Sequence, residues 1–293
     1  MPRVRRNEFA YLPLAGADIR RELYVTGWGV ADYDPGETYP HPGHPEDYDF
    51  HWERGRVLGD FAVVLISRGE GEYEDRRLGR LPWRAGEVLL LPPGQWHRYR
   101  PGRGTGWAEA WCTINGEYLH RLRAKGIFPR SACLRRLGDP AACQRALTRL
   151  RATAERNSLL VESRVFEVLA HALEDRAAND DQAAPAATGQ PSVDQALEFI
   201  WLNCHRPIDA AAVARETGTA LRTLERHFST AHERSPSAEI RWSRTQRAIV
   251  MLRESRMSVK EVGYACGFGG AKGLTRALRT LHARSPSDYR PRE

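Results

Sequence analysis

The chain has 293 residues, 41% of them hydrophobic and 28% charged, with 44 Lys and Arg against 37 Asp and Glu and a formal net charge of +7. This length exceeds one typical domain of about 100–150 residues, so we expect two modules, with enough apolar residues for packed cores. These fractions, together with a mean hydropathy of −0.56, exclude a wholly disordered chain, a collagen-like repeat and a polytopic membrane protein. No apolar run approaches the ~18–20 residues that span a bilayer.

The cysteines and the amino-terminal segment indicate a cellular compartment. Five cysteines are scattered along the chain and never form a C-x-x-C pair, which favours free thiols over disulfides or a zinc site. The basic residues 1–6 are not followed by an apolar stretch with a cleavage site, so we expect no secretory signal. These patterns predict a soluble protein of the reducing cytoplasm.

The first part of the chain is rich in short β-type runs separated by Gly and Pro. Examples are the runs 61–67, 86–91 and 107–114, and no helical pattern lies between them. This spacing predicts a sandwich or small barrel, which we assign to residues 1–138.

Aromatic residues are concentrated in the same region. Six of the eight tryptophans lie before residue 112, and Tyr39, Tyr48 and Tyr99 accompany them. Flat apolar rings stack on the C–H faces of sugars while Arg, His and Glu bind hydroxyl groups, so this composition favours a sugar pocket. The alternative is that these rings only fill the core, and we expect this of about half of them.

Residues 139–176 change to a helical period. One apolar stripe runs along the second half of this segment, at Val161, Val165, Val168, Leu169, Ala172 and Leu173, and Leu147, Leu150 and Ala154 indicate a partner helix before it. Such a helical pair either closes the core of the β-domain or forms a dimer interface. We favour dimerisation because the stripe is long. Residues 177–191, rich in Ala, Asp, Gly and Pro, are predicted to be a linker.

Residues 192–293 are helical in pattern and carry most of the positive charge. They hold 17 Lys and Arg against 11 Asp and Glu. Such an asymmetry suggests a partner that bears phosphates, although a basic solvated surface explains the charge alone equally well.

The same segment contains an internal repeat. Residues 222–228, followed by Arg-Ser-Pro-Ser at 234–237, reappear 50 residues later as 272–278, followed by the same four residues at 284–287. Each copy is predicted to be a helix-turn-helix unit. In the first, Asp209 caps a short helix that ends near Gly218, and a second helix follows over 221–231. In the second, Ser258 and Glu261 form a capping box and Gly267 ends the helix.

A long helix is predicted to join the two units. Ser235 is the N-cap and Pro236 is the first helical residue, and the apolar pattern continues to about residue 254. Roughly 19 residues at ~1.5 Å each make a rod of about 28 Å. This length approaches the ~34 Å between successive major-groove faces on one side of DNA, so one chain could read two adjacent grooves.

These residues and spacings resemble the DNA-binding domain of the AraC/XylS transcription regulators over about a hundred residues. The sequence departs from the family at Ala220, where Ser is usual, at Lys272 and Gly273, where Ser and an aromatic residue are usual, and at Leu278, where Phe is usual. The resemblance implies that the second helix of each unit contacts DNA. The residues implied are Arg222, Glu225, Arg226, Lys272, Thr275 and Arg276; Arg suits guanine and Glu suits cytosine, while Arg226 and Arg276 could equally bind phosphates.

The β-rich part resembles a cupin barrel of the arabinose-binding type. The run from Gly86 through Pro92, Pro93 and Gly94 to His97 matches the second conserved cupin motif. The expected preceding strand near 61–69 contains no histidine, so we expect no metal or cofactor, although His41 and His44 together with His97 are an alternative metal set. The resemblance and strand alternation imply a ligand site made of Arg54, His97, Tyr99, Glu109 and Trp111.

Together these observations predict an α+β multidomain protein. Its parts are a cupin-like β-barrel that binds a ligand, a helical dimerisation pair, a linker, and an all-α DNA-binding domain. We expect a sequence-specific transcription regulator with no catalytic residues, and a homodimer whose effector is a sugar. Activation and contact with RNA polymerase are implied by the resemblance. The alternative is a metal-dependent cupin enzyme fused to a DNA-binding domain.

Overall fold

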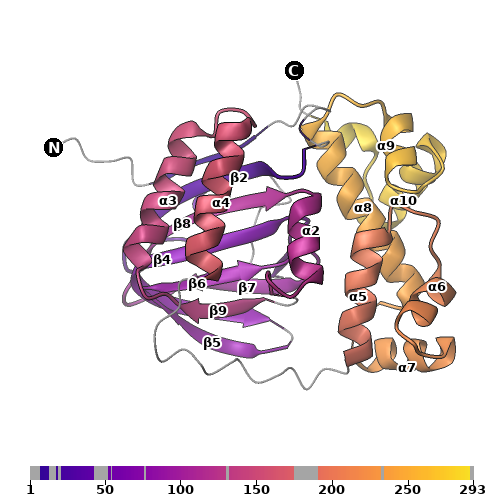
Figure 1. The fold of residues 1–293 in the computed structure, drawn as a ribbon, viewed down its shortest axis with the longest axis horizontal. Coiled ribbons are helices and arrows are strands. Elements are labelled where there is room, and N and C mark those ends of the chain that lie inside the picture. Colours follow the sequence, from indigo (N-terminus) through magenta and orange to yellow (C-terminus); the bar gives the residue numbers. More distant parts are fainter. Residues whose placement is uncertain are drawn as a thin grey trace. The chain divides into compact units, whose positions relative to one another are not determined.

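The computed structural model describes residues 7–12, 18, 21–42, 52–53, 55–75, 77–129, 132–174, 191–231 and 234–290. These residues form two compact units, an N-terminal one and a C-terminal one that begins with the helix at 191 (Figure 1). Most of the predicted linker, together with Arg54 and His44, lies outside the described residues.

The N-terminal unit is built on a nine-stranded antiparallel sheet. Its main path runs in the order β1-β2-β8-β4-β6-β9, while β3 pairs with β7, and both β5 and β7 pair with β4. The strands are β1 (Asn7–Tyr11), β2 (Tyr24–Tyr33), β3 (Arg56–Val57), β4 (Phe61–Asp75), β5 (Gly79–Arg84), β6 (Glu87–Leu91), β7 (Trp96–Pro101), β8 (Trp107–Asn115) and β9 (Cys133–Arg136). The predicted β-rich cupin-like architecture is confirmed.

Strand β4 is longer than the run predicted at 61–67. Its first part pairs with β6 and β8, and its second part, residues 70–75, pairs with β5 and β7. One strand therefore belongs to both layers of the sheet. The second half is charged and glycine-rich and has no apolar strand pattern, so the sequence does not reveal it as a strand.

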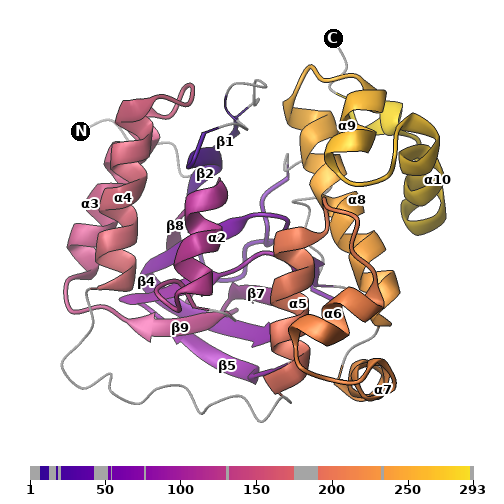
Figure 2. The same ribbon diagram turned by 45° about the vertical axis from the view of Figure 1, so that its right-hand side comes forward.

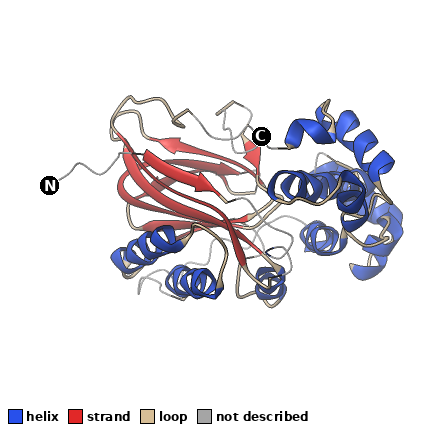
Figure 3. Cartoon of the chain, turned by 90° about the horizontal axis from the view of Figure 1, so that it is seen from above, coloured by secondary structure: helices blue, strands red, loops and turns tan. Residues whose placement is uncertain are grey.

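Three helices cover one face of this sheet (Figure 3). They are α2 (Glu117–Ala124), α3 (Pro140–Thr153) and α4 (Leu159–Leu173). Asp139 and Ser158 cap α3 and α4 by accepting hydrogen bonds from the backbone N–H groups of Ala142 and Val161. These caps satisfy N–H groups that have no partner within the helix.

The apolar stripe of α4 packs inward, which corrects the interpretation that we favoured. Val161, Val165, Val168, Leu169 and Ala172 share one core cluster with sheet residues such as Val63 and Leu65. The stripe therefore closes the core of the N-terminal unit. Dimerisation stays a prediction and would need a different face, because these side chains are already buried.

The C-terminal unit is entirely helical in its described residues. It contains α5 (Pro191–Asn203), α6 (Ala210–Glu216), α7 (Leu221–Ala231), α8 (Pro236–Glu254), α9 (Val259–Ala265), α10 (Ala271–His282) and a 3-10 turn at Pro286–Tyr289. Helix α8 has 19 residues and α7 lies where predicted. No helix among the described residues is long and apolar enough to cross a membrane.

The predicted helix ends are confirmed by the backbone geometry. Asp209 accepts a hydrogen bond from the backbone N–H of Ala212, and Ser258 and Glu261 form a reciprocal capping box. Gly218 and Gly267 follow α6 and α9 with φ angles of +63° and +76°. Left-handed angles of this kind end a helix at little cost only in glycine.

Candidate functional site

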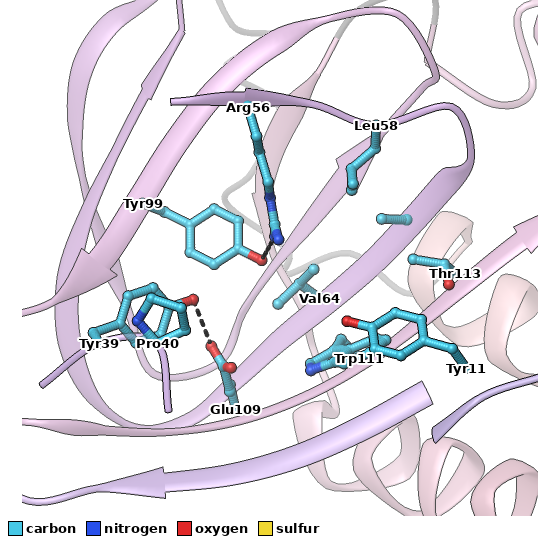
Figure 4. A pocket seen from close by; sticks show the side chains of 11 residues that line it. Tyr11, Tyr39, Pro40, Arg56, Leu58, Val64, Tyr99, Glu109, Trp111 and Thr113 are labelled. Atoms are coloured by element: carbon cyan, nitrogen blue, oxygen red, sulfur yellow. Dashed lines mark hydrogen bonds between the residues drawn. The ribbon is translucent and has the colours of Figure 1, made fainter. Parts of the chain in front are cut away.

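A small cavity lies inside the N-terminal unit, between the layers of its sheet. Figure 4 shows Tyr39 and Pro40 on one side of it and Tyr11 and Trp111 on the other. Its volume is about 30 Å³, enough for one or two water molecules. Strands β1, β3, β4, β7 and β8 and the loop that follows β2 contribute to the lining. The lining residues are Tyr11, Tyr39, Pro40, Arg56, Leu58, Ala62, Val64, Tyr99, Glu109, Trp111 and Thr113.

Arg56 is the cation of this cavity, and two neighbours fix its orientation. Its Nη2 donates a hydrogen bond to the Tyr99 hydroxyl at 2.5 Å, and its Nε donates to Nε2 of His97 at 3.3 Å. Strand pairing between β3 and β7 sets Arg56 opposite His97. These two partners therefore hold the guanidinium in a defined plane at the cavity.

His97 lies on the side of Arg56 away from the cavity and accepts a hydrogen bond from it. Its side chain is completely buried, and its Nδ1 lies 3.0 Å from the carbonyl oxygen of Gln95. Burial, together with the nearby charge of Arg56, lowers the His97 pKa to about 3. The ring is therefore neutral, with Nδ1–H donating to Gln95 and Nε2 accepting from Arg56.

Glu109 supplies a carboxyl group to the same cavity. It projects from β8 with only 7% of its surface exposed, and Tyr39 donates a hydrogen bond to its Oε2 at 3.4 Å. Burial raises the Glu109 pKa to about 7, although the charge of Arg56 and the bond from Tyr39 act in the opposite direction. Burial wins because removal of water penalises the carboxylate more than these partners stabilise it. Glu109 can therefore exchange a proton near neutral pH.

Trp111 forms an aromatic wall of the cavity, and the residue opposite it on β2 is a glycine, which leaves space for the indole ring. In the register of β2 and β8, Trp111 lies opposite Gly29. A Cβ atom at Gly29 would come within 2.4 Å of the indole ring. The ring therefore lies over the β2 backbone, and the ring of Tyr11 packs 5.8 Å from it, centroid to centroid.

The structure brings together three of the five predicted ligand residues. Tyr99, Glu109 and Trp111 line the cavity, whereas His97 is buried behind Arg56 and does not line it. Sequence reasoning missed Arg56, Tyr11 and Thr113. Arg56 lies two residues after Arg54, so strand alternation from the predicted residue would have found it.

The surroundings of His97 do not suit a metal ion. Both of its ring nitrogens are engaged in hydrogen bonds, and the Arg56 guanidinium would repel a cation at that place. His41 stacks on Tyr33, with ring centroids 4.3 Å apart. Within the described part of the chain, no group of three or more His, Cys, Asp and Glu side chains could hold a metal.

The early tryptophans were expected to divide between the core and the ligand pocket, but most of them lie outside the pocket. Trp83 and Trp107 are completely buried between the sheet layers, and Trp28 donates its indole N–H to the carbonyl oxygen of Ala154 in the turn after α3. The guanidinium of Arg100 stacks over the ring of Trp52, with its central carbon 3.7 Å from the ring centroid. Of the six early tryptophans, only Trp111 lines the cavity described above.

The second candidate site consists of α7 and α10 in the C-terminal unit. Helix α7 directly precedes α8 in the chain, and α10 lies beside α8 and α9 (Figures 1 and 2). In each of them an apolar face is buried, through Leu224 and Phe228 in α7 and through Leu274 and Leu278 in α10. The opposite face is polar. It presents the exposed side chains of Arg222, Glu225, Arg226, Lys272 and Arg276, and the half-buried side chain of Thr275.

Comparison with known proteins finds a family model for each of the two units. An AraC-like ligand binding domain matches residues 36–169, and a helix-turn-helix domain matches residues 213–292. The chain is 30% identical over 105 residues to the HTH-type transcriptional regulator GlxA of Rhizobium meliloti, across 36% of this chain and 32% of that protein. It is 20% identical over 241 residues to the Msm operon regulatory protein of Streptococcus mutans, across 80% and 85%.

These matches differ in extent. The chain spans about a third of the length of GlxA and of the regulators ArgR and GbdR of Pseudomonas aeruginosa. A crystal structure of apo ToxT from Vibrio cholerae is 14% identical with a TM-score of 0.49, and the match covers 93% of this chain and 98% of that one. The two domain matches, in this order along one chain, place the protein in the AraC family.

Proposed function

We propose that this protein is a transcription regulator that binds a specific DNA sequence through α7 and α10 and responds to a small molecule in the N-terminal cavity. The observation that carries the proposal is the pair of helices with buried apolar faces and exposed polar faces, joined by the 19-residue α8. At ~1.5 Å per residue, α8 is about 28 Å long. This length suits two successive major grooves, which lie ~34 Å apart.

The exposed residues of α7 and α10 have the chemistry for this task. Arg222 and Arg226 offer paired donors for guanine O6 and N7, and Glu225 offers an acceptor for the amino group of cytosine. Lys272, Thr275 and Arg276 take the corresponding places in α10. Arginines that bind phosphates instead would position the protein without specifying sequence.

The proposed effector is a sugar. Trp111 and Tyr11 present aromatic faces, Arg56 presents donors held in place by Tyr99 and His97, and Glu109 presents acceptors. This combination of flat apolar and polar surfaces is typical of small-molecule sites. A cavity of about 30 Å³ is smaller than any sugar ring. Binding would therefore have to move a wall, and that movement would favour one state of the protein over another.

The remaining proposals concern assembly and location. A homodimer would use residues 139–176, where α4 exposes Leu159, Leu160 and Phe166 away from the stripe that is buried in the core. Residues 1–138 would be the sensor, 177–191 the linker and 192–293 the DNA-binding domain. Activation of transcription, contact with RNA polymerase and a cytoplasmic location follow from the family resemblance and the cysteine pattern.

DNA binding is tested with the whole chain and a fluorescent duplex from upstream of its own gene, in titrations at several salt concentrations. We expect binding that is tighter than to a shuffled duplex of the same composition and that weakens steeply as salt rises. Absence of salt-sensitive binding to any duplex would refute the function.

The effector class is tested by a thermal-shift screen of pentoses, hexoses and small oligosaccharides. A sugar present at 100 times its Kd should stabilise the folded state by about 2.7 kcal/mol. Replacement of Glu70, which is exposed on β4, by Gln should leave this shift intact, whereas Glu109→Gln should reduce it. If none of the sugars stabilises the chain, the effector belongs to another class.

A further inference from the structure

A groove in the C-terminal unit lies between the first half of α8 and α10, and Ile208 and Asp209, just before α6, also line it. Its volume is about 490 Å³. Ile240 of α8 and Phe268, in the turn before α10, contribute apolar surface to its lining. The polar residues that line it include Asp209, Arg241, Arg244 and Arg276.

The charged groups of this groove have different roles. Arg244 donates hydrogen bonds to the carbonyl oxygens of Cys204 at 2.5 Å and Arg206 at 2.8 Å, so it holds the backbone before α6 in place. The carboxylate of Asp209 accepts from the backbone N–H of Ala212 as the cap of α6. These two side chains are therefore engaged within the protein.

Arg241 and Arg276 are not engaged in this way. Both side chains are exposed, one on α8 and one on α10, and neither forms an ion pair with another described residue. The groove therefore presents two available guanidinium groups against one carboxylate that is already bound. Charge complementarity favours an anionic occupant, and the planar guanidinium suits the oxygens of a phosphate.

The place of the groove identifies that anion. If α7 and α10 enter successive major grooves, as the proposed function requires, the stretch of duplex between them passes the middle of the C-terminal unit. That stretch presents its minor groove and its phosphates, which carry one negative charge per ~1.7 Å of helix axis. The groove beside α10 lies in this middle region, because its walls come from α8 and from both helix-turn-helix units.

We propose that this groove receives the phosphate backbone of the DNA between the two recognition helices, with Arg241 and Arg276 binding phosphate oxygens from α8 and from α10. The inference rests on the proposed function and extends it. Arg241 is not on a recognition helix, so it would contribute to affinity and position and would not read bases.

The test compares Arg241→Ala with the unchanged chain in duplex titrations between 50 and 200 mM salt. Loss of one phosphate contact lowers the slope of log affinity against log salt by about 0.9. The affinity deficit of the variant should therefore shrink about threefold over this range. It should be equal for specific and shuffled duplexes, and Arg241→Lys should restore part of it.

Arg256→Ala is the matched control, because it removes one exposed positive charge from the connection between α8 and α9, away from the groove. It should leave the salt slope unchanged. If the unchanged chain binds DNA and Arg241→Ala has the same affinity and slope, this inference is overturned and the proposed function stands. If Arg241→Ala binds DNA normally but no longer supports regulation of transcription, the inference is also overturned, and the groove would instead bind a protein partner. If the unchanged chain binds no duplex, the proposed function itself fails.

Discussion

Glu109 is the carboxyl group whose protonation should make the stability of the N-terminal unit depend on pH near neutrality. The substitution Glu109→Gln isolates this effect, because it keeps the shape and removes the titration. Several titratable groups around the cavity interact electrostatically with Glu109 or with its neighbours and so affect their pKa values. They are Arg56, Tyr39, Tyr99, Tyr33 and Tyr11. Of these only Arg56 is charged at neutral pH, so the carboxyl dominates the titration of the cavity.

The size of this change in the free energy of unfolding follows from the pKa of Glu109, which burial raises from 4.5 to about 7. Between these two values the folded state holds a proton that the unfolded state has lost, so unfolding becomes easier as pH rises. A pKa difference of about 2.5 at ~1.36 kcal/mol per pH unit is about 3 kcal/mol. This stabilisation is fully present below pH 4.5, falls through the interval to pH 7 and is absent above it.

The assay is urea unfolding at a series of pH values, followed by tryptophan emission, which reports mainly the N-terminal unit because six of the eight tryptophans precede residue 112. The difference in unfolding free energy between Glu109→Gln and the unchanged chain cancels the other titrating groups. We expect this difference to move by about 3 kcal/mol in favour of the variant between pH 4.5 and 7. Glu70→Gln should show no such movement. A difference that is flat with pH would show that Arg56 keeps Glu109 ionised, contrary to our reasoning.

Three further substitutions test the structure at separate places. Asn157→Ala removes buried hydrogen bonds to both backbone groups of Val25, at 2.8 and 3.1 Å, and should cost about 2–4 kcal/mol in urea unfolding; a cost below about 1 kcal/mol would contradict this anchoring. Gly29→Ala places a methyl group against Trp111 and should destabilise by about 1–3 kcal/mol, with a shift in tryptophan emission; an unchanged spectrum would mean that the indole lies elsewhere. Arg222→Ala should weaken binding to the cognate duplex by about 1–3 kcal/mol and relax specificity at one base pair, and an unchanged Kd would reject its role in reading bases.

Much of the C-terminal unit could be predicted from the sequence because its signals are local. A capping residue, a glycine at a helix end and an apolar period of 3.6 act within a few residues of each other. Ser258 with Glu261 and Ser235 with Pro236 fixed two helix starts in this way. The repeat placed α7 and α10, and their amphipathic pattern indicated which side chains would be exposed.

The cavity was predictable only in part, because strand pairing over long separations assembles it. Glu109 and Trp111 follow from alternation within β8, but Tyr11 reaches the same space only because β1 pairs with β2, which pairs with β8. Arg56 faces the cavity because β3, only two residues long, pairs with β7. The sequence alone therefore determined the helices and the residue types of each site. Tertiary packing decided which aromatic and charged groups meet in the cavity, and it decided that the apolar stripe of α4 is buried. These contacts join residues that are far apart in the sequence and have no local signal between them.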